Sequence, residues 1–214
     1  MSNHFVFDIE VFRYGWLVVF KDNETDEETH FTKSAGNVDT NIREWMDQQD
    51  GLLLCGFNNK HYDDYILKAI YYGFSIADIK DLNDFIIGGG QGWEWPKWNY
   101  HRMPFETYDI RDDLPITLSL KEIEGNMGLI IVESPVPFDL DRPLTKEEWM
   151  ETLMYCKWDV DATDRLRQKR QAYLESKIYV GELAGLTPGK SMGMTNAKLT
   201  AAYLTSKGAK PKTW

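Results

Sequence analysis

The run LLLCGF at positions 52–57 is apolar without a break and leads directly into a helical pattern that ends at Gly73. A strand that alternates apolar and polar residues can face water on one side. A continuously apolar strand, in contrast, is typical of a sheet covered on both faces. This run therefore predicts a central strand with helices packed on each side of it.

Three strand-like runs precede this central strand. They cover residues 4–9, 15–21 and 27–32, are rich in β-branched and aromatic residues, and are separated by turn-forming residues. This pattern predicts an antiparallel meander.

Later segments alternate between helix and strand. Thr145 and Glu148 form a capping-box pattern, which predicts the start of a long helix whose apolar stripe runs to Leu166. A meander followed by alternating strands and helices indicates the α/β class, with one mixed sheet flanked by helices. The other predicted elements are helices over about 38–49 and 76–87, a strand over 105–110 and a short helix in the sequence TLSLKEIEGNMG.

The net charge of −10 argues against a protein that holds nucleic acid on a basic surface, because phosphate affinity normally comes from lysine and arginine. The charge is uneven, however, since no acidic residue follows Glu182. An acidic body thus carries a basic C-terminal segment. Its lysines are Lys190, Lys198, Lys207, Lys210 and Lys212.

The cysteines and the N-terminus indicate the cellular setting. Cys55 and Cys156 lie in apolar patterns far apart in the sequence, which argues against a disulfide and favours a reducing, intracellular environment. The N-terminus lacks the basic and apolar regions of a signal peptide, and no segment reaches the length of a membrane span. We therefore expect neither secretion nor membrane insertion.

Two carboxylates lie at the end of the first predicted strand. Asp8 and Glu10 are two residues apart, so strand alternation points both to the same face. Two acids in this position repel each other and need solvent or a cation, and hard divalent cations favour oxygen ligands. Taken alone, the pair is better explained as an exposed strand end.

Two further acidic motifs follow. Asn59, Tyr62 and Asp63 lie where the central strand passes into a helix, a place where ligand-binding residues often sit in α/β sheets. Tyr155 and Asp159 are four residues apart on the long helix and share one of its faces. In isolation, the first motif is typical of a helix cap and the second of an ordinary amphipathic helix.

The three motifs, in this order, resemble those of the DEDD exonuclease superfamily, in the branch with a tyrosine in the last motif. The resemblance covers about residues 4–170. The sequences LSLKEIEGNMGL, DLDRPLTKEEW and YCKWDVDAT are similar to exonuclease domains of phage replicative polymerases, especially the protein-primed family B type. This resemblance implies a ribonuclease H-like fold and a metal-dependent 3′→5′ exonuclease that proofreads for a DNA polymerase.

The resemblance also implies catalytic roles for five residues. Two Mg²⁺ or Mn²⁺ ions would be held by Asp8, Glu10, Asp63 and Asp159. The ions would activate a water molecule and stabilise the leaving 3′ oxygen. Tyr155 would orient the water without ionising, because a phenol is a poor base at neutral pH but a good hydrogen-bond partner.

The single-stranded 3′ end of DNA would, by the same resemblance, contact Asn59 and Tyr62, the aromatic ring by stacking on a base. Ile9 and Phe12 are further candidates, as wedges between the last bases. One feature of the subgroup is absent: residues 132–135 lack the lysine that usually precedes the DxxRP-like stretch and contacts the substrate. Lys157 is the candidate substitute.

Residues 1–175 are predicted to form the exonuclease domain, and residues 176–214 a basic helical segment that begins a polymerase region. The polymerase motifs Tyr-x-Asp-Thr-Asp and Ser-Leu-Tyr-Pro are absent, so the chain itself is not expected to synthesise DNA. The expected partners are a single-stranded DNA 3′ end and the remainder of a polymerase chain. The expected location is the cytoplasm of a bacterial host, if the chain is phage-encoded.

Three alternatives stay open at this point. The chain could be a free-standing exonuclease, a catalytically inactive nucleic-acid-binding module of the same fold, or a ribonuclease H-like endonuclease. The presence of all four acids and Tyr155 counts against the inactive module. An endonuclease would not require the helix that carries Tyr155 and Asp159, and its cleavage would not depend on a DNA end.

Overall fold

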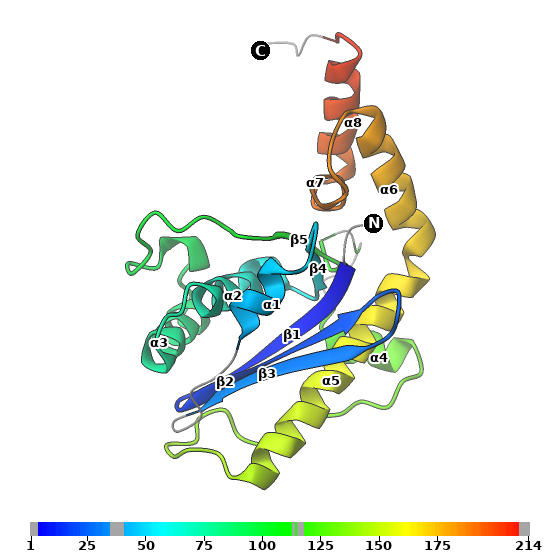
Figure 1. The fold of residues 1–214 in the computed structure, drawn as a ribbon. Helices are drawn as coiled ribbons and strands as arrows, with labels where there is room; N and C mark the ends of the chain where they lie inside the picture. Colours follow the sequence, from blue (N-terminus) through cyan, green and yellow to red (C-terminus); the bar gives the residue numbers. More distant parts are fainter. Residues whose placement is uncertain (1–3, 35–40, 113, 115–117, 210–214) are drawn as a thin grey trace.

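The computed structural model describes residues 4–34, 41–112, 114 and 118–209, which form a five-stranded mixed sheet flanked by helices (Figure 1). The strands are β1 (His4–Phe12), β2 (Gly15–Asp22), β3 (Glu28–Ser34), β4 (Leu53–Gly56) and β5 (Glu106–Asp109). Their order is β3-β2-β1-β4-β5. The first three strands form the predicted antiparallel meander, and β4 and β5 continue the sheet in parallel with β1.

Helices pack on both faces of this sheet (Figure 1). One core lies under α1 (Ile42–Asp47), α2 (Asp63–Tyr71) and α3 (Ile76–Ile87). The other lies under α4 (Leu120–Asn126) and α5 (Lys146–Lys169). The α/β class and the mixed sheet flanked by helices are therefore confirmed.

Alternation along the strands divides residues between the two cores. In β4, Leu54 belongs to the core beneath α2, whereas Leu53 and Cys55 belong to the core beneath α5, and all three are buried. The prediction that this apolar run is covered on both faces is correct. In β1, Phe7 enters the first core and Val6 the second.

The start of α5 has the predicted capping box. The Thr145 hydroxyl accepts a hydrogen bond from the backbone N–H of Glu148 at 3.2 Å, and the Glu148 carboxylate accepts one from the backbone N–H of Thr145 at 2.8 Å. Arg142 adds a bidentate pair to the same carboxylate, at 2.6 and 2.7 Å. These bonds satisfy backbone donors that a helix start leaves without partners, and they fix where the long helix begins.

The last helices form an arm that leaves the sheet (Figure 1). The hydroxyl of Thr187 ties the arm to Glu106 of β5 by a 3.0 Å hydrogen bond. The predicted domain boundary at 175/176 falls inside a continuous helix, so the helical segment begins earlier, at Gln171. Lys210 and Lys212 lie outside the described residues. The arm consists of α6 (Gln171–Leu183), α7 (Pro188–Met192) and α8 (Asn196–Ser206).

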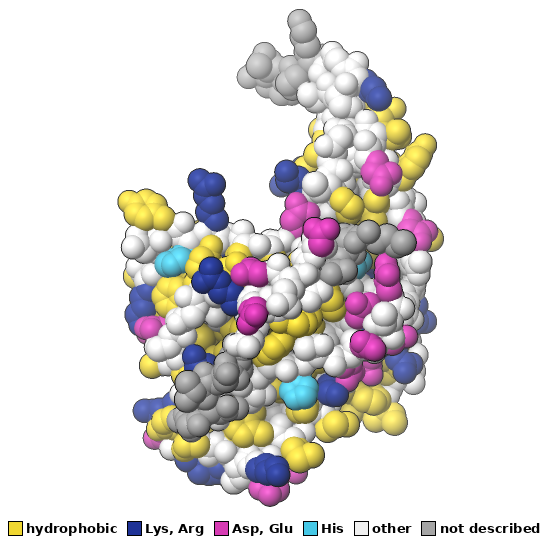
Figure 2. All heavy atoms as spheres, in the orientation of Figure 1, with side chains coloured by type: hydrophobic (Ala, Val, Ile, Leu, Met, Phe, Trp, Pro, Cys, Tyr) yellow, Lys and Arg dark blue, Asp and Glu magenta, His cyan; other side chains and the backbone are white. Residues whose placement is uncertain are grey.

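The surface carries both signs of charge. On the face shown in Figure 2, lysine and arginine side chains are scattered among acidic ones and do not gather into one basic patch. This agrees with the acidic composition of the chain. Within the described ranges, none of the helices is both long and apolar enough to span a membrane.

Gly15 sets how closely α5 approaches the sheet, which generates a prediction about stability. A Cβ at this position would lie 2.4 Å from the carbonyl oxygen of Lys33 and 2.8 Å from the ring of Trp149. We expect Gly15→Ala to lower the free energy of unfolding by about 1–3 kcal/mol, because overpacking forces strand or helix to move.

The matched control is Gly125→Ala in α4, where the new methyl group would meet only Ile131 at 3.5 Å. That change is expected to raise the stability by up to about 1 kcal/mol, since alanine is a better helix former than glycine. Urea unfolding of both variants measures the difference. Equal stability of the two variants would contradict the close packing at Gly15.

Candidate metal centre

β1 carries the first two acids on the face that α5 covers. Asp8 and Glu10 alternate with Phe7 and Ile9, whose side chains belong to the opposite core. Glu10 is only 7% exposed, and Asp8 is partly buried. Their ligand atoms lie within 4.8 Å of each other. Strand alternation thus places two carboxylates side by side in a place that is not an exposed strand end.

The junction between β4 and α2 is shaped by close contacts. Asn58 adopts a left-handed φ of 62°, and a Cβ at Gly56 would lie 2.6 Å from the Cβ of Asn59. The Asn59 amide donates to Asp64 at 2.8 Å, and Thr107 of β5 donates to the same carboxylate at 2.6 Å. Asp64 therefore anchors the junction from inside the protein.

Asp63 opens α2 directly after this junction and is 7% exposed. Burial raises the pKa of Asp63, and the charge of Asp8 raises it further; the charge of Asp63 in turn adds to the raised pKa of Glu10, which burial causes first. The second motif is therefore brought to the two acids of β1.

The third motif comes from α5. Tyr155 and Asp159 lie one turn apart, and Cys156 between them is fully buried. The Cys156 thiol donates a hydrogen bond to the Asp8 carboxylate, with 3.4 Å between sulfur and Oδ2. Because α5 packs on β1 through this contact, Asp159 also lies beside the β1 acids.

Burial raises the pKa of all four carboxylates, and repulsion from other acids of the cluster adds to it at Asp8, Glu10 and Asp63. Burial, with a further contribution from Asp159, raises the pKa of Asp8 from 3.8 to about 7. The pKa of Glu10 is raised by burial first, then by Asp8, Asp159 and Asp63. Burial is also the largest cause of the raised pKa at Asp63 and Asp159. The four groups share one electrostatic field, in which four negative charges are costly without a cation.

This donor set suits a hard divalent cation. Carboxylate oxygens are the ligands that Mg²⁺ and Mn²⁺ prefer. Within the part of the chain that the structure describes, Asp8, Glu10 and Cys156 have ligand atoms within 4.8 Å of one another. Burial and the neighbouring acids raise the pKa of the Cys156 thiol, so it stays protonated and acts as a hydrogen-bond donor to Asp8.

Tyr155 stays protonated as well. Burial and the charge of Asp159 place the pKa of its phenol far above the usual value. The phenol lies one helical turn from Asp159, and its influence lowers the pKa of that carboxyl. Tyr155 can therefore orient a water molecule or a carboxylate, and it cannot serve as a base at neutral pH.

Lys121 is a member of the site that the sequence motifs do not reveal. It lies on α4, and its ammonium donates to Asp159 and, at 3.2 Å, to Glu124. Lys121 and Glu124 are three residues apart on the helix that follows the Ser119 cap. This spacing is a signal for a local ion pair, but nothing in it points to the carboxylates of β1 and α5.

Two of the residues expected to contact DNA are buried. Asn59 is fully buried and its amide is engaged by Asp64, so it acts inside the strand-to-helix junction. Phe12 is 1% exposed, with its ring 5.3 Å from Phe138 and 5.7 Å from Trp149. Both residues therefore lie in the interior of this structure.

The other two expected contacts lie beside the acids. Ile9 and Tyr62 line a hollow of about 400 Å³ together with Glu10, Ile87 and Phe138. The Tyr62 hydroxyl is held by Asn83 at 2.5 Å, which leaves its ring as one wall of the hollow. Ile9 is mostly core, at 4% exposed, so Tyr62 is the better placed of the two for contact with a ligand.

Lys157 does not approach the acids. Its ammonium pairs with Glu28 of β3 at 2.6 Å. The candidate substitute for the missing substrate lysine is therefore engaged elsewhere.

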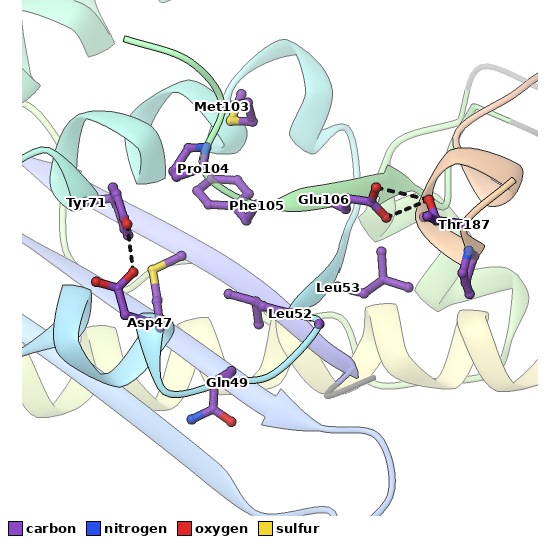
Figure 3. Close-up of a pocket in the computed structure, with 14 residues that line it drawn as sticks. Asp47, Gln49, Leu52, Leu53, Tyr71, Met103, Pro104, Phe105, Glu106 and Thr187 are labelled. Atoms are coloured by element: carbon purple, nitrogen blue, oxygen red, sulfur yellow. Dashed lines mark hydrogen bonds between the residues drawn. The ribbon is translucent and has the colours of Figure 1, made fainter. Parts of the chain in front are cut away.

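A larger hollow, of about 650 Å³, lies at the other end of the parallel strands, where β4 and β5 begin (Figure 3). Its polar side chains pair with each other: Tyr71 with Asp47 at 2.7 Å, and Thr187 with Glu106 at 3.0 Å. It holds none of the acids of the three motifs. Despite its size, it has no grouping of unpaired reactive side chains, and we place the candidate site at the acid cluster.

Comparison of the chain with models of known protein families gives no match, and comparison with curated proteins gives no similar protein. The case for the site therefore depends on the motif residues and on their geometry.

The raised pKa of Asp8 generates a prediction about stability and pH. Because the folded pKa lies above the unfolded one, the metal-free protein loses stability as pH rises from 3.8 to about 7. Asp8→Asn removes this charge. We expect the variant, without metal, to melt several degrees above the wild type at pH 8 and at nearly the same temperature at pH 4.

Added Mg²⁺ should reverse the order at pH 8, since only the wild type keeps the full set of ligands. Melting followed by circular dichroism at the two pH values provides the measurement. A variant less stable than wild type at pH 8 without metal would contradict the electrostatic account of the cluster.

The placement of Asn59 predicts a structural role. Asn59→Ala removes a donor to the buried Asp64 carboxylate and is expected to lower the free energy of unfolding by about 2–3 kcal/mol. The control, Asn126→Ala, changes an exposed asparagine of α4 and should stay within about 0.5 kcal/mol of wild type. Urea unfolding distinguishes them, and unchanged stability of Asn59→Ala would restore a contact with DNA as the better role.

Proposed function

We propose that this chain is a metal-dependent 3′→5′ exonuclease that removes nucleotides from single-stranded DNA ends, with a ribonuclease H-like fold and a site of the tyrosine-containing DEDD type. One observation carries the proposal: the ligand atoms of Asp8 and Glu10 lie within 4.8 Å of each other, and the charges of Asp63 and Asp159 act on this pair. Asp8 and Glu10 come from β1, Asp63 from the start of α2, and Asp159 from α5. Carboxylates held together away from water are costly to a fold, and a bound divalent cation offsets that cost.

The order of the elements supports the same family. The motifs lie on the first strand, at a strand-to-helix junction and on a late helix, and the mixed sheet has helices on both faces. The position of Tyr155 one turn from Asp159 on α5 agrees with the tyrosine branch, in which this phenol directs the attacking water.

A divalent metal held by these acids supplies the charge that makes a water molecule nucleophilic and balances the leaving 3′ oxygen. The residues of the chain do the remaining work. Asp8, Glu10, Asp63 and Asp159 would hold the metal, and the Cys156 thiol donates a hydrogen bond to the Asp8 carboxylate. Tyr155 orients the water that attacks the terminal phosphodiester.

The DNA end is expected to lie at Tyr62. Its ring borders the hollow beside Glu10, where a terminal base can stack while its phosphate reaches the acids. Stacking on an aromatic ring tolerates any base, which suits an enzyme that removes mismatched ends. The scattered surface lysines agree with a phosphate that is received mainly by metal.

We further propose that the chain works as the proofreading part of a phage-type DNA polymerase, in the cytoplasm of a bacterial host. The partners in this proposal are the single-stranded 3′ end and the rest of the polymerase. A free-standing exonuclease is the alternative, and activity without any further polypeptide would favour it.

The test is digestion of a 5′-labelled single-stranded DNA in Mg²⁺ or Mn²⁺. We expect a ladder that shortens from the 3′ end and disappears with EDTA. Asp8→Ala and Asp159→Ala should each slow cleavage roughly a thousandfold, because each removes several kcal/mol of transition-state stabilisation through the metal. Asp161→Ala is the control, since Asp161 is on the same helix but pairs with Lys21 at 2.7 Å.

The result also separates the alternatives. Cleavage of a circular single strand, which has no end, would indicate an endonuclease. Intact DNA with both metals would remove the exonuclease proposal for the isolated chain and favour an inactive module. Equal loss of activity in Asp161→Ala and Asp159→Ala would show that unfolding, not loss of a ligand, causes the effect.

A further inference from the structure

An ammonium group lies among the acids of the candidate centre. Lys121 donates to Asp159 and to Glu124, and its side chain is 20% exposed. It lies 4.9 Å from the centre of the Tyr155 ring. Its charge acts on Asp8 and Glu10 as well as on Asp159. Lys121 thus neutralises part of the charge that burial makes costly.

Glu124 fixes the position of this ammonium. Glu124 is fully buried, and its Oε2 has no hydrogen-bond partner among the described residues, so Lys121 is its compensating charge. Ile123, beside it, belongs to the core under α5, and the Ser119 capping box fixes the start of the helix. A buried carboxylate with one unsatisfied oxygen lowers stability. Glu124 is therefore poorly explained as a residue that only stabilises the fold.

The ammonium of Lys121 donates a hydrogen bond to a carboxylate that the metal would also bind. Asp159 is one of the four acids of the centre, and one of its oxygens is engaged by Lys121. Like charges repel, so a divalent cation and an ammonium that share one carboxylate oppose each other's binding. This coupling is reciprocal. The free energy by which bound metal weakens the interaction of Lys121 with the cluster equals the free energy by which Lys121 weakens metal binding.

We propose that Lys121 is a resident counter-ion of the acid cluster, held in place by Glu124, and that it competes with divalent metal for Asp159. The inference rests on the proposed metal centre and goes beyond it, because it assigns a fourth element, α4, to the control of metal affinity. Lys121 is a positioning residue in this scheme. It stabilises the site before metal binds and gives way when metal arrives.

The test compares two substitutions with opposite charge effects. Lys121→Met removes the competitor, so we expect Mn²⁺ to bind about tenfold more tightly, which corresponds to about 1.4 kcal/mol. Glu124→Gln removes a negative charge and leaves the ammonium to the cluster alone, so Mn²⁺ should bind about threefold more weakly. Mn²⁺ binding is measured by electron paramagnetic resonance, without DNA.

Opposite signs are the decisive feature. If Lys121 and Glu124 only kept the site in shape, both substitutions would weaken metal binding, and that result would overturn the proposal. Unchanged affinity in Lys121→Met would overturn it too. The conservative variant Lys121→Arg should bind Mn²⁺ with the wild-type affinity, because it keeps the positive charge.

The matched control is Lys157→Met, which makes the same change in net charge. Lys157 lies on α5 and pairs with Glu28. This substitution should leave Mn²⁺ affinity unchanged, and an effect as large as that of Lys121→Met would show that net charge alone is responsible. The outcome is independent of nuclease activity. Opposite shifts without DNA cleavage would support the counter-ion and remove the exonuclease, whereas cleavage with unchanged Mn²⁺ affinity would do the reverse.

Discussion

The main constraint on this structure is the repulsion among four carboxylates that are largely withdrawn from water. Asp8 and Glu10 occupy the face of β1 that α5 covers, and Asp159 comes from α5 itself. Burial and repulsion act in the same direction on their pKa values, so each element carrying an acid must be held against a force that separates it from the others. The cores on both sides of the sheet supply that hold.

Polar contacts around the cluster then determine where each acid points. Cys156 bonds Asp8, and Lys121 bonds Asp159. Asn59 holds Asp64 so that the adjacent Asp63 opens α2 toward β1. These contacts are themselves buried or partly buried. Burying polar groups costs free energy, and the packing of α5 on the sheet offsets that cost. Packing in the two cores thus stabilises the fold against the repulsion among the buried acids.

Sequence patterns predicted much of this arrangement because they are local. The apolar run that became β4 and the capping box at Thr145 depend on neighbours along the chain, and both are present as expected. The interior positions of Phe12 and Asn59 were not predicted. Phe12 lies two residues from Glu10 and Asn59 four residues from Asp63. The burial of Phe12 is decided by Phe138 and Trp149, far away in the sequence, and that of Asn59 by the strand-to-helix packing.

The sequence by itself determined the α/β class and the pairing of Asp8 with Glu10 on one strand face, because periodicity is a property of short segments. Only the tertiary structure decided that Lys121 of α4 reaches Asp159, with Glu124 buried behind it. The distance between two side chains on different elements follows from how the elements pack, and packing is a sum over the whole core that no local pattern contains.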